Sequence, residues 1–272
     1  MQQCRINGFE VGRPAPVRIM GVINCSPESF FQGSRVKTCD VLEFARTMVD
    51  QGADLIDVGA RSTSPKAPPI SPDVEAERIE LALQELEGSG ITVSVDTTRP
   101  EVLSRCLQYD IHAVNDIGGL SDERYAKIVA DSGLPAFLMA SVSAPGDPTD
   151  IQTTFGALGE VVSRCRSFGI EEYVLDPAIG LWSPERTVAL DWALCRNFGK
   201  FARFERPLLA AVSRKTFIGS LLNQQNPEDR LIGSIAVTVL LLHAGADMVR
   251  CHDVRETKEA VRVYEEMERG MS

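Results

Sequence analysis

Eight short apolar segments, each followed by a helical pattern, constrain the fold of this chain more than any other feature. The predicted strands cover 17–23, 55–58, 92–95, 112–114, 136–139, 173–175, 208–212 and 248–249. The helices predicted between them cover 39–51, 73–87, 100–108, 122–132, 155–168, 184–198, 214–222 joined to 227–243, and 255–268. Continuous apolar strands that alternate with helices are typical of a parallel sheet covered by helices.

Two architectures satisfy this alternation, the doubly wound sheet and the (β/α)8 TIM barrel. The first strand is not followed by the Gly-x-Gly-x-x-Gly loop that a dinucleotide-binding doubly wound sheet carries. Eight even units in 272 residues, with no Pro- or Ser-rich linker, favour an α/β fold of one domain over residues 1–272, a single (β/α)8 TIM barrel. Residues 1–16 are expected to add an N-terminal β-hairpin, because Asn7-Gly8 is a strong turn signal.

Charge and cysteine content limit the partners and the compartment. The net charge of −10 argues against nucleic acid and anionic membrane surfaces. The longest uncharged apolar run covers residues 231–246, fewer than the roughly 20 residues that cross a bilayer, and the N-terminus lacks a signal-peptide pattern. The seven cysteines show no metal-binding spacing and are expected to be reduced thiols. We therefore expect a cytoplasmic protein with small-molecule substrates, no nucleic-acid partner and no membrane partner.

Polar residues stand at the carboxyl ends of seven of the eight predicted strands, which is where TIM-barrel active sites are built. They are Asn24, Asp57, Asp96, Asn115 with Asp116, Asp176, the run Ser213-Arg214-Lys215, and Arg250 with His252. Each one has a structural alternative, since Asp is a common helix N-cap and Lys215 would fit a solvated first turn. Their joint occurrence at one rim is explained more simply by a polar pocket.

Arg250 and His252 are two residues apart in a predicted strand, so their side chains are expected to point the same way. Asp253 and Glu256 resemble a capping box that begins the next helix and leaves its N–H groups available. A guanidinium, an imidazole and a helix start together suit a phosphate or pyrophosphate. A surface arginine beside a hydrogen-bonded histidine is the alternative.

The remaining rim residues suit a heterocycle. Asp96, Asn115 and Asp176 supply hydrogen-bond acceptors and an amide, which fit the donor-rich edge of an aminopyrimidinone. Asn24 stands next to the predicted phosphate site and offers an oxygen to Mg²⁺, which takes few protein ligands and many from phosphate and water.

The motifs that carry these residues resemble those of the dihydropteroate synthase family, within the pterin-binding barrels. They lie at 19–30, 52–59, 94–97, 114–117, 175–177, 212–219 and 245–254, in family order. The resemblance implies a (β/α)8 barrel, usually a homodimer. It also implies a transferase of folate biosynthesis that joins 6-hydroxymethyl-7,8-dihydropterin pyrophosphate to p-aminobenzoate and releases pyrophosphate, with Mg²⁺ as cofactor.

The resemblance also implies roles for single residues. Lys215, Arg250 and Asp96 would be catalytic, and the pterin would be held by Asp96, Asn115, Asp176, Lys215 and Arg250. The pyrophosphate would lie against Asn24, Thr63, Arg250 and His252, with Asn24 also binding the metal. The arylamine site would be bordered by Phe30, Pro65, Ser213 and Thr216.

Three loops depart from the family pattern and suggest a divergent or archaeal-type member. Arg61-Ser-Thr-Ser-Pro65 replaces a Glu-Ser-Thr-Arg-Pro motif, the segment 139–146 lacks a usual His, and 178–183 replaces a Gly-Phe-Gly-Lys stretch. These changes put the second substrate in question more than the reaction. The alternatives are a ribosylated aminobenzene phosphate of methanopterin biosynthesis as acceptor, a methyltetrahydropterin-binding methyltransferase, and a non-catalytic pterin-binding paralogue.

Overall fold

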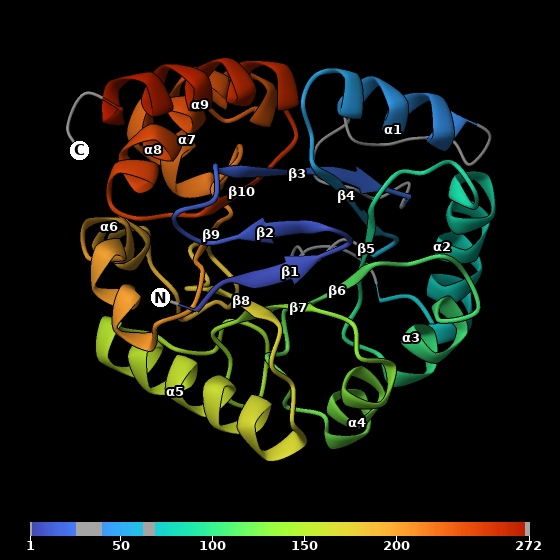
Figure 1. The fold of residues 1–272 in the computed structure, drawn as a ribbon. Helices are drawn as coiled ribbons and strands as arrows, with labels where there is room; N and C mark the ends of the chain where they lie inside the picture. The colour runs from blue at the N-terminus through green and yellow to red at the C-terminus, as the bar shows by residue number, and fades with distance from the viewer. Residues whose placement is uncertain (1, 26–39, 62–68, 270–272) are drawn as a thin grey trace.

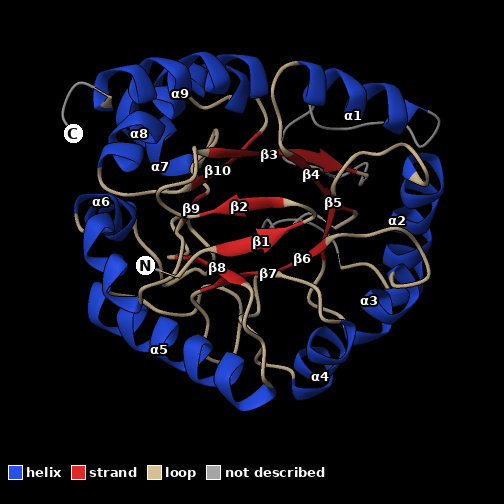
Figure 2. Cartoon of the chain, viewed as in Figure 1, coloured by secondary structure: helices blue, strands red, loops and turns tan. Residues whose placement is uncertain are grey.

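A ring of eight parallel strands forms the centre of the protein, and the helices lie outside it (Figures 1 and 2). The structure is a computed structural model that describes residues 2–25, 40–61 and 69–269. The ring is formed by β3 (Arg18–Asn24), β4 (Leu55–Gly59), β5 (Val93–Asp96), β6 (Ala113–Asp116), β7 (Ala136–Met139), β8 (Tyr173–Asp176), β9 (Leu209–Ala210) and β10 (Met248–Cys251). Hydrogen bonding follows the order β8-β7-β6-β5-β4-β3-β10-β9, and an isolated parallel bridge from Leu175 to Leu208 closes the ring.

Helices follow the strands along the chain, as the alternating pattern predicts. They are α1 (Val41–Asp50), α2 (Pro72–Leu86), α3 (Pro100–Cys106), α4 (Glu123–Ser132), α5 (Ile151–Phe168), α6 (Val188–Arg196), α7 (Thr216–Leu222), α8 (Leu231–His243) and α9 (Val254–Glu268), with 3-10 helices η3 (Phe198–Phe204) and η4 (Pro227–Arg230). Within the described ranges, no helix has both the length and the apolar content that a bilayer crossing requires.

A hairpin covers the amino-terminal end of the ring. Strands β1 (Cys4–Ile6) and β2 (Phe9–Val11) pair antiparallel around Asn7 and Gly8, whose positive φ angles of 38° and 87° give the predicted turn. The hairpin crosses the near end of the barrel in Figure 1. Its buried side chains pack on inward-facing apolar residues of the ring, namely Met20, Leu55, Ala113, Phe137, Val174, Leu209 and Met248. The predicted TIM barrel with an N-terminal hairpin is therefore confirmed.

Strand register divides the barrel interior into an apolar and a polar layer. Side chains alternate across a strand, and residues paired in register share a face. Met20, paired with Leu55 and Arg250, faces inward, so two steps of alternation also bring Asn24 inward at the end of β3. In the same way Asp96, paired with Asn115, faces inward. The polar layer therefore lies at the carboxyl ends, at the opposite end of the barrel from the hairpin.

Two predicted helix starts were wrong for identifiable reasons. The predicted helix 184–198 begins only at Val188, after the cap Thr187, because the preceding Arg186 turns its side chain into the interior. Helix α5 begins at Ile151 rather than 155, because Asp150 and Thr153 form a capping box. The predicted strand 208–212 is reduced to Leu209–Ala210.

Candidate active site at the carboxyl ends of the strands

Arg250 joins two carboxylates at the polar end of the barrel. Its Nε donates to Oδ2 of Asp57 over 2.7 Å, and its Nη2 donates to Oδ2 of Asp96 over 2.8 Å. The Nδ2 of Asn115 donates to the same Oδ2 of Asp57 over 2.8 Å. Side chains of β4, β5, β6 and β10 are thereby held in one hydrogen-bonded cluster, as the sequence pattern at the rim predicts.

The two carboxylates of this cluster lie in different surroundings. Asp57 is fully buried, and its Oδ1 has no hydrogen-bond partner in the described part of the chain. The Asp96 side chain is 18% exposed, so a ligand can reach it. Burial, with the nearby Asp57, raises the pKa of Asp96 to about 7, and the charge of Arg250 opposes this change. One guanidinium between two carboxylates thus leaves acceptor capacity for a ligand that carries N–H groups.

Lys215 lies against the loop that follows β8. Its Nζ donates to the carbonyl oxygen of Ile179 and lies 4.9 Å from the centre of the Trp182 ring, a cation–π distance. Burial lowers the pKa of Lys215 to about 8, although the carboxylates of Asp176 and Asp191 favour the charged form. Burial also raises the pKa of Asp176, and Lys215 opposes that rise. Lys215 is therefore a half-buried lysine whose pKa lies close to neutral pH, and it is not a solvated first-turn lysine.

His252 enters the site as a neutral imidazole. Its Nδ1 lies 2.9 Å from Oγ of Ser213, and its backbone N–H donates to the same Oγ over 3.2 Å. Burial, reinforced by the positive charges of Arg250, Arg214 and Lys215, lowers the pKa of His252 to about 3. The ring can therefore exchange hydrogen bonds with a phosphate but adds no charge of its own.

Arg214 fixes the backbone that carries Lys215. The residue has a positive φ of 56°, and its side chain forms a fork with Asp253 at 2.8 and 2.5 Å. Its guanidinium also donates to the carbonyls of Pro227 and Glu228, each over 2.8 Å. The predicted capping box at Asp253 was therefore wrong: this carboxylate makes no cap hydrogen bond to α9 and instead binds Arg214.

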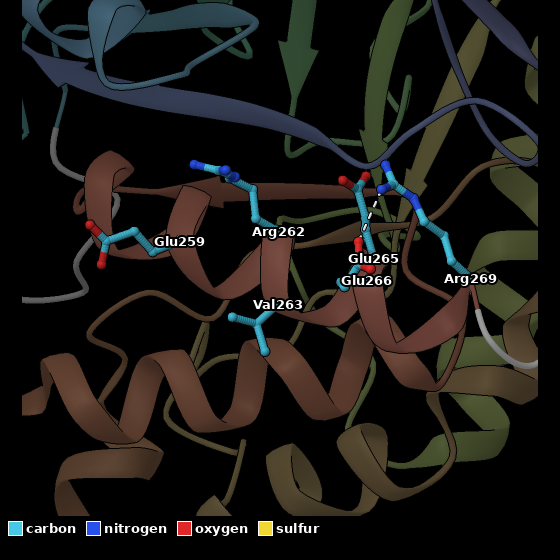
Figure 3. Close-up of a pocket in the computed structure, with 6 residues that line it drawn as sticks. All are labelled: Glu259, Arg262, Val263, Glu265, Glu266 and Arg269. Atoms are coloured by element: carbon cyan, nitrogen blue, oxygen red, sulfur yellow. Dashed lines mark hydrogen bonds and ion pairs between the residues drawn. The ribbon is translucent and has the colours of Figure 1, made fainter.

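A groove on the outside of α9 lies away from the strand ends (Figure 3). It encloses about 510 Å³ and contains charges of both signs, among them the ion pair of Glu266 and Arg269 at 3.0 Å. The lining residues are Glu259, Arg262, Val263, Glu265, Glu266 and Arg269. No residue of the predicted pocket takes part in it, so the two features are separate.

Comparison with known proteins now identifies the family. Residues 20–252 match the family model described as pterin binding enzyme. The chain is 35% identical to the dihydropteroate synthase of Escherichia coli strain K12 over 261 residues, which covers 91% of this chain and 90% of that protein. The chain belongs to the dihydropteroate synthase family. The resemblance carried by the motifs is thus confirmed.

Solved structures of the family superpose on nearly the whole barrel. The dihydropteroate synthase of Yersinia pestis in complex with a sulfonamide drug gives a TM-score of 0.88 at 30% identity, covering 98% of this chain and 99% of that one. The Thermus thermophilus enzyme in complex with 4-aminobenzoate gives 0.83 at 31% identity, covering 98% and 100%. The fold of this dihydropteroate synthase family member is therefore that of its relatives.

Most of the site residues expected from the family pattern meet at one rim. Lys215, Arg250, Asp96, Asn115, Asp176, Asn24, Ser213 and His252 all stand at or just after the carboxyl ends of ring strands. Thr216 is the first residue of α7 and is exposed. Phe30, Thr63 and Pro65 lie outside the described residues.

Sequence reasoning missed the importance of one residue and overrated another. Asp57 was seen at the rim but given no role, yet it links Arg250 to Asn115. The signal that could have identified Asp57 is the two-residue period of β4, which places its side chain on the inner face of the barrel. Asp116 was also counted at the rim, but it accepts hydrogen bonds from the N–H groups of Gly118 and Leu120 in its own loop, each at 2.7 Å. Asp116 is thus structural.

Arg61, which departs from the family pattern, is bound between α2 and β5. Its Nε lies 3.6 Å from Oε2 of the buried Glu75, and its Nη2 donates to Oγ1 of Thr98 over 3.1 Å. Glu75 also pairs with Arg99 at 3.0 Å and accepts a hydrogen bond from Thr97 over 2.7 Å. The described contacts of Arg61 are those of a packing residue.

Proposed function

We propose that this protein joins 6-hydroxymethyl-7,8-dihydropterin pyrophosphate to p-aminobenzoate and releases pyrophosphate. The observation that carries the proposal is the clamp of Arg250 on Asp57 and Asp96 at a rim that also holds Asp176 and Lys215. The family supports the same reaction, since a Coxiella burnetii relative is a dihydropteroate synthase in complex with pteroic acid and a Thermus thermophilus relative is in complex with 4-aminobenzoate.

The pterin is assigned to the carboxylate side of the rim. Asp96 and Asp176 accept hydrogen bonds from the amino and ring N–H groups, and Asn115 adds an amide whose orientation is fixed by Asp57. Arg250, held between its two carboxylates, offers a guanidinium face to a planar ring. Lys215 donates to a ring acceptor.

The pyrophosphate is assigned to the strands beside the β10–β3 pair. Arg250 supplies charge there, His252 supplies a neutral hydrogen-bonding ring, and the predicted Thr63 would add a hydroxyl. Asn24 ends β3 next to them and would hold Mg²⁺ through its amide oxygen. Within the described ranges, no three His, Cys, Asp or Glu side chains are grouped to hold a metal. This fits Mg²⁺, which would take most of its oxygens from pyrophosphate and water and would neutralise the leaving group when bound.

The reaction requires the protein to stabilise developing charge and to position the two substrates. The bond between the pterin methylene carbon and the pyrophosphate oxygen breaks, the arylamine nitrogen bonds to that carbon, and the nitrogen loses a proton to solvent or pyrophosphate. Positive charge that develops on the pterin methylene is stabilised by Asp96 and Asp176. Ser213 and Thr216, with the predicted Phe30 and Pro65, would border the arylamine and align its nitrogen. No side chain needs to form a covalent intermediate.

The test is a direct assay with dihydropterin pyrophosphate, Mg²⁺ and p-aminobenzoate, in which both pyrophosphate and the condensed product are measured. Equimolar formation of the two supports the proposal. Product formation only with a ribosylated aminobenzene phosphate would replace the acceptor, and pterin binding without turnover would favour a methyltransferase or a non-catalytic paralogue. Removal of Mg²⁺ with a chelator should abolish turnover, and readdition of the metal should restore it.

A second copy of the chain is the partner we propose for the exposed apolar face of α7, α8 and α9. On α8, Ile232 is 84% exposed and Leu240 is 67% exposed, with both on one side of the helix at a spacing of two turns. The same region exposes Leu221, Leu222, Val263 and Met267. Several large apolar side chains exposed on neighbouring helices are typical of an interface rather than of a free surface.

The cytoplasm remains the proposed compartment. The six cysteines in the described ranges are all free thiols, and none of those ranges contains a disulfide. A reducing compartment fits this chemistry.

A further inference from the structure

The loop after β8 presents a carbonyl to Lys215 through an unusual backbone path. Ala178 has a φ of +61° and Gly180 a φ of +141°, and between them the carbonyl of Ile179 accepts the hydrogen bond from Lys215. A left-handed conformation costs about 1–2 kcal/mol for a residue with a Cβ, so it persists only where neighbouring contacts hold it. The side chain of Asp176 provides one such contact, since its Oδ1 accepts from the N–H of Ala178 over 2.8 Å.

A buried ion pair provides the other contacts. The guanidinium of Arg186 donates to the carbonyl of Ala178 over 2.7 Å, and Oδ1 of Asp191 accepts from the N–H of Gly180 over 2.7 Å. Arg186 and Asp191 lie 3.5 Å apart, and both side chains are fully buried. The pair therefore grips the peptide groups on both sides of Ile179, whose carbonyl binds the lysine.

Arg186 also ties this loop to the loop after β7. The same guanidinium donates to the carbonyls of Pro148, over 2.9 Å, and Gly146, over 3.3 Å. Trp182 packs on Gly146, and its Nε1 donates to the carbonyl of Ala178 over 3.1 Å. These are two of the three segments in which the chain departs from the family pattern, so the departures are joined in one packed unit.

The pair is poorly arranged for stability alone. Nε of Arg186 and Oδ2 of Asp191 have no hydrogen-bond partner in the described part of the chain, although both atoms are buried. A buried ion pair with unsatisfied atoms is often no more stabilising than apolar residues of similar size. Its contacts are instead concentrated on the backbone that holds Lys215.

We propose that Arg186 and Asp191 are positioning residues for Lys215, acting through the backbone of residues 178–180. They touch no substrate atom in this scheme. The effect on turnover rests on the proposed function, but the effect on the lysine does not. Loss of the pair should release the carbonyl of Ile179 and let the ammonium move toward water.

Trp182 offers a way to observe Lys215 without any substrate. The chain has two tryptophans, and the ring of Trp192 packs edge-on against Phe217, with the ring centres 4.8 Å apart. In a Trp192→Phe background the emission therefore reports on Trp182 alone. Deprotonation of Lys215 next to its ring should change that emission with a midpoint near pH 8, and Lys215→Met should abolish the change.

The test variant is Arg186→Met/Asp191→Leu, which removes one charge of each sign and fills the space with apolar atoms. The charged groups that face Lys215 are Asp176, Asp191, Arg186 and Arg250, and the neutral but titratable His252 also lies close to it. Asp191 favours the charged lysine more strongly than Arg186 opposes it, so the loss of the two charges alone would lower the midpoint. An upward shift therefore reports movement of the ammonium toward water. The control is Arg105→Met/Glu80→Leu, which removes a bidentate pair with distances of 2.7 and 2.5 Å between α3 and α2.

The positioning variant should move the emission midpoint upward by about one pH unit or more and reduce its amplitude, and kcat/KM should fall by at least about tenfold. The control pair should change neither. A lower melting temperature with an unchanged midpoint and unchanged kcat/KM would overturn the proposal, because it would assign the pair a purely structural role. If the wild-type protein has no synthase activity but the variant still shifts the midpoint, the proposed function is contradicted and the positioning role is supported.

Discussion

The Nε of Arg250 lies 2.7 Å from Oδ2 of Asp57, although the two residues are 193 positions apart in the chain. They belong to β10 and β4, which are separated in the ring by β3, so the contact spans the inside of the barrel. Asp57 is fully buried, and this guanidinium is its ion-pair partner. A ligand that draws Arg250 toward pyrophosphate must therefore also change the carboxylates that face the pterin.

Arg250→Lys should lower kcat/KM by roughly 100-fold, because one ammonium cannot replace a fork that binds two carboxylates at once. The measurement is steady-state kinetics with circular dichroism to check folding. Arg105→Lys is the matched control, since Arg105 also binds a carboxylate through two nitrogens but lies between α2 and α3. Equal activities for the two variants would contradict the role of Arg250.

Asp96→Asn should stabilise the protein at pH 8 while reducing turnover. The folded-state pKa of Asp96, about 7, lies above its ordinary value of 3.8, so protonation favours folding. The stability that depends on the proton is complete below about pH 4 and is lost as the pH rises through 7. Asparagine does not titrate, and Arg250 keeps Asp57 as its partner.

Urea unfolding at pH 4 and pH 8 tests this prediction. The variant should match the wild type at pH 4 and exceed its free energy of unfolding by up to about 4 kcal/mol at pH 8. A variant that is less stable than the wild type at pH 8 would show that the ionised Asp96 stabilises the fold through its ion pair, which contradicts the raised pKa.

Gly146→Ala should destabilise the protein by displacing Trp182. A Cβ at this position would lie well inside contact distance of Cγ of the indole, and the φ of +63° is itself unfavourable for alanine. Gly133→Ala isolates the backbone cost, because Gly133 has a φ of +66° with no atom within 4 Å of the added Cβ. Urea unfolding should give Gly146→Ala an additional loss of about 1–3 kcal/mol. If the two variants lose the same free energy of unfolding, Trp182 is displaced at no cost and the prediction is contradicted.

Ile232→Glu should convert the proposed dimer to a monomer without unfolding it, because the side chain is 84% exposed within one chain. Sedimentation velocity measures the change in mass. Leu81→Glu, at a 49% exposed position on α2, introduces the same charge on another face and should leave the dimer intact. If both variants sediment with the mass of a dimer, α8 does not form the interface.

Local patterns were sufficient for the fold and for part of the site. Strand hydrophobicity and spacing specify the barrel, because each strand and helix is encoded within its own segment. The two-residue period also brings Arg250 to the inner face of β10, as its pairing with Met20 in register requires. The Asn7-Gly8 turn is equally local.

Contacts between distant segments were not readable in this way. Asp253 has the sequence context of a helix cap. In the structure its carboxylate instead accepts two hydrogen bonds from the guanidinium of Arg214, 39 residues away in the chain. Arg186 lies in a stretch that reads as a helix start, yet its side chain is bound by carbonyls of another loop. A carboxylate in a regular pattern was therefore assigned to a cap because its remote partner could not be read from the local sequence.

The order of the strands in the ring has a bearing on how the site is made during synthesis. Strand β10 is the last to leave the ribosome, and it inserts between β3, the first strand of the ring, and β9. A nascent chain that ends before Met248 has neither a closed ring nor a counter-charge for Asp57. Competence to bind substrate is therefore acquired only when the C-terminal segment has been translated, and truncated products of this gene should be inert.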